Sequence, residues 1–344
     1  MSQHRIMEKG LLLNPDGSLR EPGWATEPLL VYNRASVRES RYRLKEWDYY
    51  LVNDGEYAVA FTLCNAGYAA LLTVTVVDID DPADHTETHL KPMPGDSVVL
   101  PTSSDSGVSF YSDDRVKMVF DNTGDERILD VMMRRFCGGT FAAHIELDRF
   151  PRDSMVIATP WTEKETAFYY NRKVVGMRAR GEFSYDGIRH EFDGSDSFGL
   201  LDWGRGVWTY DNHWYWGVAQ GNQGGHVAAL NVGYGFGDTT AASENMFFLD
   251  GVCHKLDRVD FGIPRKRTGE FELMESWRLT SNDGRLEMLF SPYLDRSSKI
   301  DVGVVMTNQH QIFGELDGYV VLDDGTKFHV ENMQASAEVV HNRY

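Results

Sequence analysis

Long hydrophobic runs are missing from this sequence of 344 residues. The longest apolar stretch, around Tyr68–Val77, has only the length of a β-strand, so we expect no membrane insertion. No apolar region of signal-peptide length follows the first residues, Met1–Arg5. The sequence therefore predicts a soluble, cytoplasmic protein.

Cysteine is also scarce. The three residues Cys64, Cys137 and Cys253 lie far apart and form no Cys-x-x-Cys pair. This spacing argues against a disulfide framework and against a zinc site, and the His residues show no ligand spacing either. We predict no metal and no disulfide.

The signatures of several common enzyme classes are absent. The sequence contains no Gly-x-Ser-x-Gly, no phosphate-binding Gly-x-x-x-x-Gly-Lys-[Ser/Thr] and no His-Glu-x-x-His. Gly233–Gly237 resembles a nucleotide loop only superficially, because no helix is predicted after it, and we interpret it as a flexible or tightly packed turn. We predict no cofactor.

Basic residues are fewer than acidic residues. Lys and Arg total 34 against 52 Asp and Glu, which gives a net charge of −18. A field of this sign repels phosphate backbones and anionic membrane surfaces, so nucleic acid is not an expected partner. The acidic residues are scattered, and their simplest role is solubility.

Short segments of alternating polarity dominate the chain. Tyr57–Cys64 and Ala69–Val77 flank a turn at Asn65–Gly67 and predict a β-hairpin. Glu126–Arg135 is the best helical candidate, although it also fits a strand. Further strands are predicted at Val98–Leu100, Arg115–Asp121, Phe141–Leu147, Met155–Ala158 and Arg285–Phe290. Many short strands at regular spacing favour a barrel or a sandwich.

An internal repeat indicates two copies of one β-unit. Five features recur in order at an offset of 137 or 138 residues. They are Asn171, Gly176, Gly181, Asp186-Gly187 and Arg205, matched by Asn308, Gly314, Gly318, Asp324-Gly325 and Arg343. We therefore predict a mainly β fold of two lipocalin-like antiparallel β-barrel halves in tandem with few helices, divided into residues 1–205, with an N-terminal extension, and 206–344.

Four of the eight Trp residues lie between positions 203 and 216, and this segment is the first candidate site. Large aromatic faces with a few polar groups are typical of ligand pockets. Alternation along a strand would place Trp203 on the face opposite the other three. The predicted binding residues are Trp203, Arg205, Trp208, Tyr210, Trp214 and Trp216. The alternative for each Trp is packing between the barrels.

Asp202 and His213 are the candidate proton donors within this segment. A carboxyl group buried among Trp side chains keeps its proton near neutral pH, and an imidazole needs only a small shift. The alternative for Asp202 is a structural ion pair with Arg205.

A second polar and aromatic cluster comprises Glu46, Trp47, Asp48 and Tyr49. Its alternation predicts a strand with one charged face, which could contribute to a binding site. The alternative is a solvated edge strand whose charges discourage pairing with other sheets.

Asp202-Trp-Gly-Arg205 followed by Trp214-Tyr-Trp-Gly217 resembles the signature of a bacterial family, domain-of-unknown-function family 2804. The resemblance also covers Leu19–Trp24, Leu44–Tyr50 and His341–Tyr344. More distantly, the Trp-Gly pattern is similar to that of tocopherol cyclases, carotenoid hydratases, AttH-like proteins and fungal Diels–Alderases, which are tandem lipocalin-like barrels. Thr209 replaces the usual Pro of that pattern, and Asp202 replaces the His of the hydratases.

The resemblance implies an isomerase, cyclase, hydratase or lyase that acts without a redox cofactor on a small, apolar molecule in an aromatic-lined pocket. A second hypothesis is a protein that binds a lipid or polyene without changing it. A third is a carbohydrate-active protein that uses Trp platforms and carboxylates. A buried proton donor beside the ligand would favour the enzyme, and an open groove with exposed Trp faces would favour the sugar.

Overall fold

The computed structural model describes residues 3–303 and 305–343. Within these ranges the chain forms two large antiparallel sheets and a small parallel pair, β1 (Gly10–Leu11) with β3 (Leu30–Val31). The only helices among the described residues are two short 3-10 turns, at Arg34–Ser36 and Gly95–Ser97. None of the described helices is long and apolar enough to cross a membrane.

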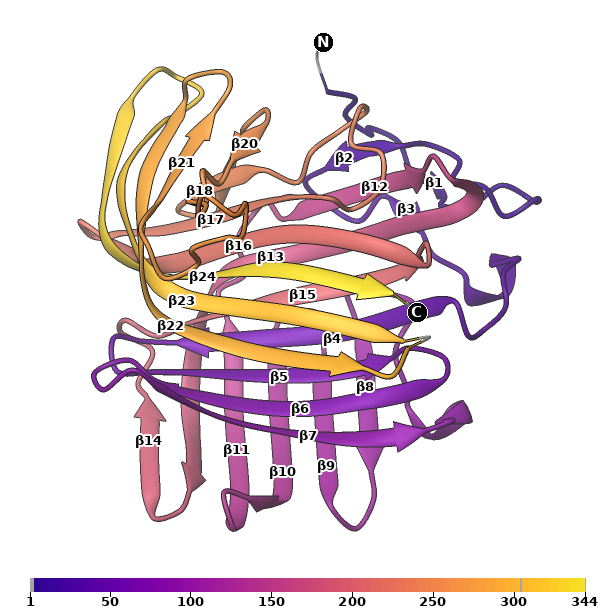
Figure 1. Ribbon diagram of the computed structural model, residues 1–344, viewed down its shortest axis with the longest axis horizontal. Helices are drawn as coiled ribbons and strands as arrows, with labels where there is room; N and C mark the ends of the chain where they lie inside the picture. Colours follow the sequence, from indigo (N-terminus) through magenta and orange to yellow (C-terminus); the bar gives the residue numbers. More distant parts are fainter. Residues whose placement is uncertain (1–2, 304, 344) are drawn as a thin grey trace.

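The first sheet has the strand order β7-β6-β5-β4-β15-β13-β11-β10-β9-β8. Its strands are β4 (Leu44–Asn53), β5 (Tyr57–Asn65), β6 (Ala69–Asp78), β7 (Ala83–Pro92), β8 (Gly107–Ser112), β9 (Val116–Asn122), β10 (Arg127–Phe136), β11 (Gly139–Asp148), β13 (Lys164–Tyr185) and β15 (Phe198–Val207). Three short strands lie off this path: β2 (Gly23–Ala25), β12 (Met155–Trp161) and β14 (Ile188–Phe192). In Figure 1 the sheet curls over itself, with β4–β7 crossing in front of β9–β11.

The second sheet has the order β19-β18-β17-β16-β24-β23-β22-β21-β20. Its strands are β16 (Asp211–Gln223), β17 (His226–Tyr234), β18 (Met246–Leu249), β19 (Val252–Lys255), β20 (Val259–Asp260), β21 (Trp277–Ser281), β22 (Leu286–Asp301), β23 (Met306–Val321) and β24 (Lys327–Arg343). The predicted fold of two curled antiparallel units in tandem is confirmed.

The repeat segments occupy equivalent places in the two sheets. In each sheet the first long strand pairs with the last, β4 with β15 and β16 with β24, and the last pairs in turn with β13 or β23. Gly181 and Gly318 both have positive φ, and a Cβ on either would overlap the backbone of the neighbouring strand. The repeated glycine therefore marks the same close approach to a neighbouring strand in each copy. The exact division at residue 205 stays a prediction.

The ambiguity at Glu126–Arg135 is resolved in favour of a strand, and one strand prediction, Val98–Leu100, is wrong. Glu126–Arg135 is not helical: β10 buries Arg127, Leu129, Val131 and Met133 and turns the intervening side chains outward, which is the period of a strand. Val98–Leu100 forms only an isolated bridge, Val99 with Phe110. The three Cys residues are free.

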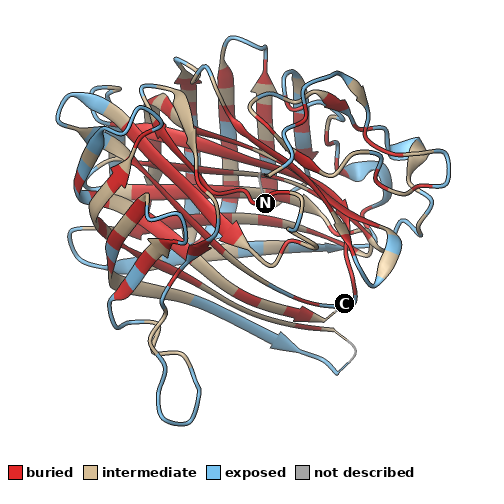
Figure 2. Cartoon of the chain, turned by 90° about the horizontal axis from the view of Figure 1, so that it is seen from above, coloured by how far each residue is buried: buried red, intermediate tan, exposed pale blue. Residues whose placement is uncertain are grey.

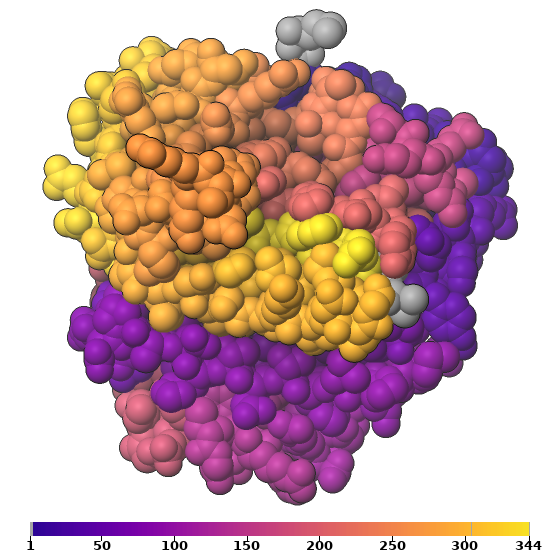
Figure 3. All heavy atoms as spheres, in the orientation of Figure 1, coloured from indigo at the N-terminus to yellow at the C-terminus, as the bar shows by residue number. Residues whose placement is uncertain are grey.

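The two sheets pack against each other along a broad contact. In Figure 3 the second sheet covers one side of the first, and in Figure 2 the buried residues gather on the strands in the interior of the molecule. The contact brings β4, β15 and β13 of the first sheet against β16 of the second, where Tyr49 packs edge-on to Trp216 with ring centroids 6.0 Å apart.

Candidate functional site

Strand β15 divides the predicted site residues between two environments. The side chain of Asp202 points toward the second sheet, whereas the side chains of Trp203 and Arg205 point into the first sheet. Trp203 packs edge-on against Tyr170, and the Arg205 guanidinium lies 4.2 Å from the centroid of the Trp203 ring. Trp203 lies apart from Trp214 and Trp216, but these residues belong to different strands, because β15 ends at Val207 and β16 begins at Asp211, so the expected alternation along one strand does not separate them.

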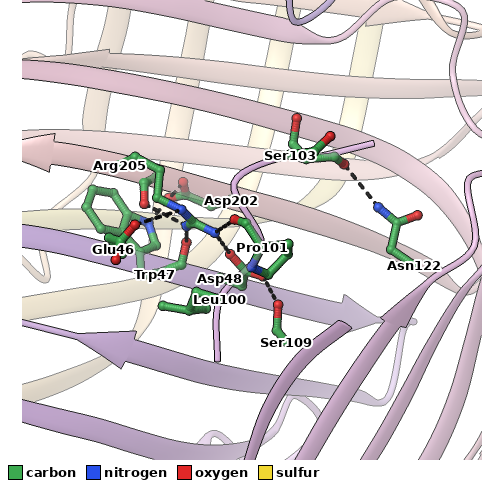
Figure 4. A network of polar contacts seen from close by, with 12 residues as sticks. Glu46, Trp47, Asp48, Leu100, Pro101, Ser103, Ser109, Asn122, Asp202 and Arg205 are labelled. Carbon is green, nitrogen blue, oxygen red and sulfur yellow. Dashed lines mark hydrogen bonds and ion pairs between the residues drawn. The ribbon is translucent and has the colours of Figure 1, made fainter. Parts of the chain in front are cut away.

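Arg205 belongs to a polar network inside the first sheet (Figure 4). Its side chain is fully buried and donates to Asp48 Oδ1 (3.0 Å) and to the backbone carbonyls of Trp47 and Pro101. Glu46 lies 3.7 Å from Arg205 Nε and also accepts from Arg34. The alternative ion pair between Asp202 and Arg205 is therefore wrong, since Asp48 and Glu46 are the carboxylates that face this guanidinium.

Strand β4 lies between β5 and β15, so it is not an edge strand. Glu46 and Asp48 are buried with Arg205, and the alternative of a solvated edge is wrong. The neighbouring residues Trp47 and Tyr49 point the other way, toward the second sheet. Alternation thus gives β4 two different faces. The face with Glu46 and Asp48 points into the first sheet, and the face with Trp47 and Tyr49, which we call the outer face, packs toward the second sheet.

The outer face carries a second buried polar group, which we call the Lys173 cluster: Tyr169, Asn171, Lys173, Asp202 and Glu244. Lys173 Nζ donates to Asn171 Oδ1 (3.0 Å), Tyr169 Oη (3.2 Å) and Glu244 Oε2 (3.2 Å), and lies 3.7 Å from Asp202 Oδ2. Asp202 Oδ1 accepts from Asn171 Nδ2 (2.6 Å) and Trp47 Nε1 (3.2 Å). Strands β13 and β15 place these groups side by side because Lys173 pairs with Asp202 in the sheet register.

Aromatic rings enclose the Lys173 cluster. Lys173 Nζ lies 5.1 Å from the centroid of the Trp216 ring and 5.5 Å from that of Phe236. Phe236 stacks on Tyr169 at 4.8 Å, and Trp208 meets Trp214 at 5.1 Å. Gly204 permits this packing, since a Cβ there would overlap the Trp47 ring. Rings of this kind stabilise cations and exclude water.

The carboxylates of the cluster outnumber its ammonium group. Burial raises the pKa of Glu244, an effect that Lys173 opposes. Burial also raises the pKa of Glu338 on β24, which accepts from Trp214 Nε1 (3.0 Å). Glu244 Oε1 has no hydrogen-bond partner among the described residues. A buried acid with an unpaired oxygen and a raised pKa is suited to hold a proton and transfer it.

His213 lies outside this cluster. It belongs to the face of β16 that carries Tyr215, the face opposite Trp214 and Trp216, and its side chain is 56% exposed. Its neighbours are Asp211 and His341, and burial lowers its pKa. Tyr210 is also exposed. Of the two predicted proton donors, therefore, only Asp202 lies in the Lys173 cluster, next to its aromatic rings.

The hollows of the structure adjoin the Lys173 cluster but do not enter it. One of about 790 Å³ is lined by Gly233, Ser243 and Asn245, which flank the cluster at Glu244 and Trp216. One of about 20 Å³ lies between the sheets, lined among others by Leu51, Leu200 and Val218. None of the four Trp residues between 203 and 216 lines either hollow, and Phe236 packs against Trp208, Trp214 and Tyr169.

Sequence reasoning missed Lys173 and Glu244. Lys173 lies within the repeated segment, two residues after Asn171, and strand alternation would have placed both on one face. Glu244 comes from the irregular segment before β18, where no periodicity assigns it a direction. The turn predicted at Gly233–Gly237 begins later, because Gly233 and Tyr234 belong to β17. In the segment 235–237, Thr159 Oγ1 donates to the Phe236 carbonyl, and Gly235 and Gly237 have positive φ.

Comparisons with known proteins agree with this architecture. The model of the family described as domain of unknown function (DUF2804) matches residues 3–344. No curated protein sequence matches the chain. Among solved structures, CghA with Sch210972 superposes with a TM-score of 0.54 at 11% identity, covering 88% of each chain. An AttH-like protein from Nitrosomonas europaea gives 0.53 at 11% identity, covering 92% of this chain and 98% of the other. At such low identity the likeness establishes the shared fold alone.

Proposed function

The chain belongs to the family of domain of unknown function 2804, and we propose that it is an enzyme that moves protons on a small, apolar molecule bound at the Lys173 cluster. The reaction class is isomerisation, cyclisation, hydration or elimination, without a redox cofactor. The observation that carries the proposal is the unpaired, buried Glu244 Oε1 amid aromatic rings.

The chemistry follows from the charges of the cluster. Protonated Glu244 donates its proton to a carbon–carbon double bond of the substrate, which leaves a carbocation. The Trp216 and Trp208 faces and the carboxylate of Asp202 stabilise this cation. The Glu244 carboxylate then accepts a proton, either from a neighbouring carbon, which yields an isomer, or from a water molecule that attacks the cation, which yields an alcohol. Lys173 holds Glu244 and Asp202 in place.

We propose that the substrate takes the place of Phe236. This side chain lies within the ring cluster on a turn with glycine on both sides, and the turn borders the hollow at Gly233 and Ser243. Movement of the turn would join the hollow to the cluster. Phe236 is itself apolar and stacked on Tyr169, so a flat, apolar molecule is the expected replacement.

Two rival functions make different use of the same residues. A binding protein needs the rings but not an unpaired buried acid, which costs free energy without serving binding. A sugar-binding site needs exposed Trp platforms, whereas each of the eight Trp residues, all of which are described, is buried or half-buried. We expect the protein to act in the cytoplasm, where its free thiols would stay reduced.

The test is to incubate the purified protein with the apolar fraction of a bacterial extract and to follow the mixture by mass spectrometry. We expect one compound to be consumed, with formation of an isomer or of a product that differs by one water molecule. Glu244→Gln should slow this by about 10²–10⁴-fold. Glu182→Gln, at an exposed site, is the matched control and should leave the rate unchanged.

A compound that binds but is recovered unchanged would show the binding protein instead. Full activity of Glu244→Gln would remove Glu244 as the acid. His213→Ala in the same assay tests the assignment made from the sequence, and the position of His213 leads us to expect no loss of proton transfer at the Lys173 cluster.

A further inference from the structure

A second group of chemically active side chains lies at one end of the second sheet, on the face that points away from the Lys173 cluster. His213 on β16 and His341 on β24 are direct partners in the register, and their rings stack with centroids 3.7 Å apart. Asp211 lies two residues before His213 and therefore on the same face. Its Oδ1 is 2.9 Å from His341 Nε2 and 3.7 Å from His213 Nε2.

These three residues meet the geometric requirements of a metal site. One ligand atom from each lies within 4.8 Å of the other two, and no other group of three or more such ligands does so in residues 3–303 and 305–343. Around a zinc ion, ligands at about 2.1 Å lie roughly 3.4 Å apart in a tetrahedron, so small side-chain rotations suffice to close the site. The cross-strand pairing already holds the two imidazoles together.

The chemistry of the group favours a transition metal over calcium or magnesium. Two imidazoles and one carboxylate are ligands for zinc, copper, nickel or cobalt, whereas calcium and magnesium prefer oxygen. All three side chains are partly exposed, so further coordination positions face water.

We propose that Asp211, His213 and His341 form a binding site for one divalent transition-metal ion of the zinc class, with water completing the coordination. The ion would link the first strand of the second sheet to its last. The expectation of no metal rested on spacing along the sequence, and His213 and His341 lie too far apart in it to form a recognisable motif.

The site is tested by calorimetric titration of the full chain, pre-treated with a chelator, with zinc chloride. We expect one equivalent to bind, no binding of magnesium, and a rise in the unfolding temperature that depends on the zinc concentration. Cobalt(II) should bind at the same site and show the visible absorption of a coordinated ion.

His213→Ala and His341→Ala should each weaken zinc binding by at least about 100-fold, more than the loss of an outer hydrogen-bond partner of a ligand usually costs. The matched control is His226→Ala, which removes an exposed His that pairs with one carboxylate, Asp250, and should bind zinc as the wild type does. If His213→Ala or His341→Ala fails to fold, thermal unfolding without zinc will show it. His213→Asn then provides a second test of zinc binding. Absence of binding, or equal weakening in His226→Ala, would refute the site.

Discussion

Lys173 Nζ and Glu244 Oε2 lie 3.2 Å apart and join the central strand β13 of the first sheet to the irregular segment that precedes β18 of the second. Both side chains are 1% exposed. The pair therefore couples the packing of the two sheets to the ionisation of one acid, and this coupling can be measured.

Stability should depend on pH through Glu244. Burial raises the pKa of the folded-state carboxyl above its ordinary 4.5, so the folded protein retains a proton that the unfolded chain has already lost. The contribution of Glu244 to the free energy of unfolding is greatest below about pH 4.5. It declines as the pH rises toward the pKa of the carboxyl in the folded protein, by up to about 1.4 kcal/mol per pH unit. Glu244→Gln removes this decline.

The measurement is urea unfolding at a series of pH values from 4 upward, a range set by the unfolded-state pKa. The free energy of unfolding of Glu244→Gln minus that of the wild type should grow with pH. Glu182→Gln, at the surface, should show no such growth. A constant difference would mean that the Glu244 carboxyl has the same pKa in the folded and the unfolded state, and it would contradict the prediction.

Gly204 should not tolerate a side chain. The added Cβ of Gly204→Ala would overlap the Trp47 ring, which donates to Asp202, so we expect a loss of about 1–3 kcal/mol and a changed tryptophan fluorescence spectrum. In Gly55→Ala the added Cβ meets nothing within 4 Å, and that variant should match the wild type in both measurements. Equal stability of the two variants would contradict the described packing.

Arg205 should contribute to folding far more than a surface arginine does. Arg205→Met leaves Asp48 and Glu46 buried without this partner, and such losses cost about 3–5 kcal/mol. Arg189→Met breaks an exposed pair with Glu182 and should cost less than about 1 kcal/mol. Chemical denaturation of both variants compares them directly, and similar midpoints would argue against the network in Figure 4.

Gly181→Ala and Gly318→Ala should cause comparable destabilisation, because each glycine has positive φ and lies close to the backbone of the neighbouring strand, β11 or β22. We expect more than about 1 kcal/mol from each. Gly139→Ala in β11 is the control, since its Cβ would lie 3.8 Å from the nearest heavy atom, the Phe136 carbonyl oxygen. If only one of the pair is sensitive, the two copies differ in this feature.

The sequence predicts features that depend on local alternation. The hairpin at Asn65–Gly67 follows from a period of two, and the structure agrees. The repeat follows instead from the nearly constant offset between its two copies. Alternation also explains why Trp47 and Tyr49 join Asp202 while Glu46 and Asp48 join Arg205, although this division was not drawn from the sequence.

Pairing between distant segments could not be predicted in this way. Glu244 reaches Lys173 only because the two sheets pack together, and His341 reaches His213 only through the register of β24 on β16. Neither of these two contacts can be recognised from the spacing of residues along the sequence or from its composition. The position of His213 has a different cause: alternation along β16 places it on the face opposite Trp214 and Trp216, and it therefore lies apart from the Lys173 cluster.

The pairing of first strand with last has a consequence for synthesis on the ribosome. β4 gains its partner β15 while the second sheet is still untranslated, so the first sheet can close early. β16 must wait until β24 has left the exit tunnel, and until then one of its edges is open. A pause in translation within β17–β23 would therefore expose the nascent chain to chaperones, or to strand exchange with a neighbouring copy, at this edge.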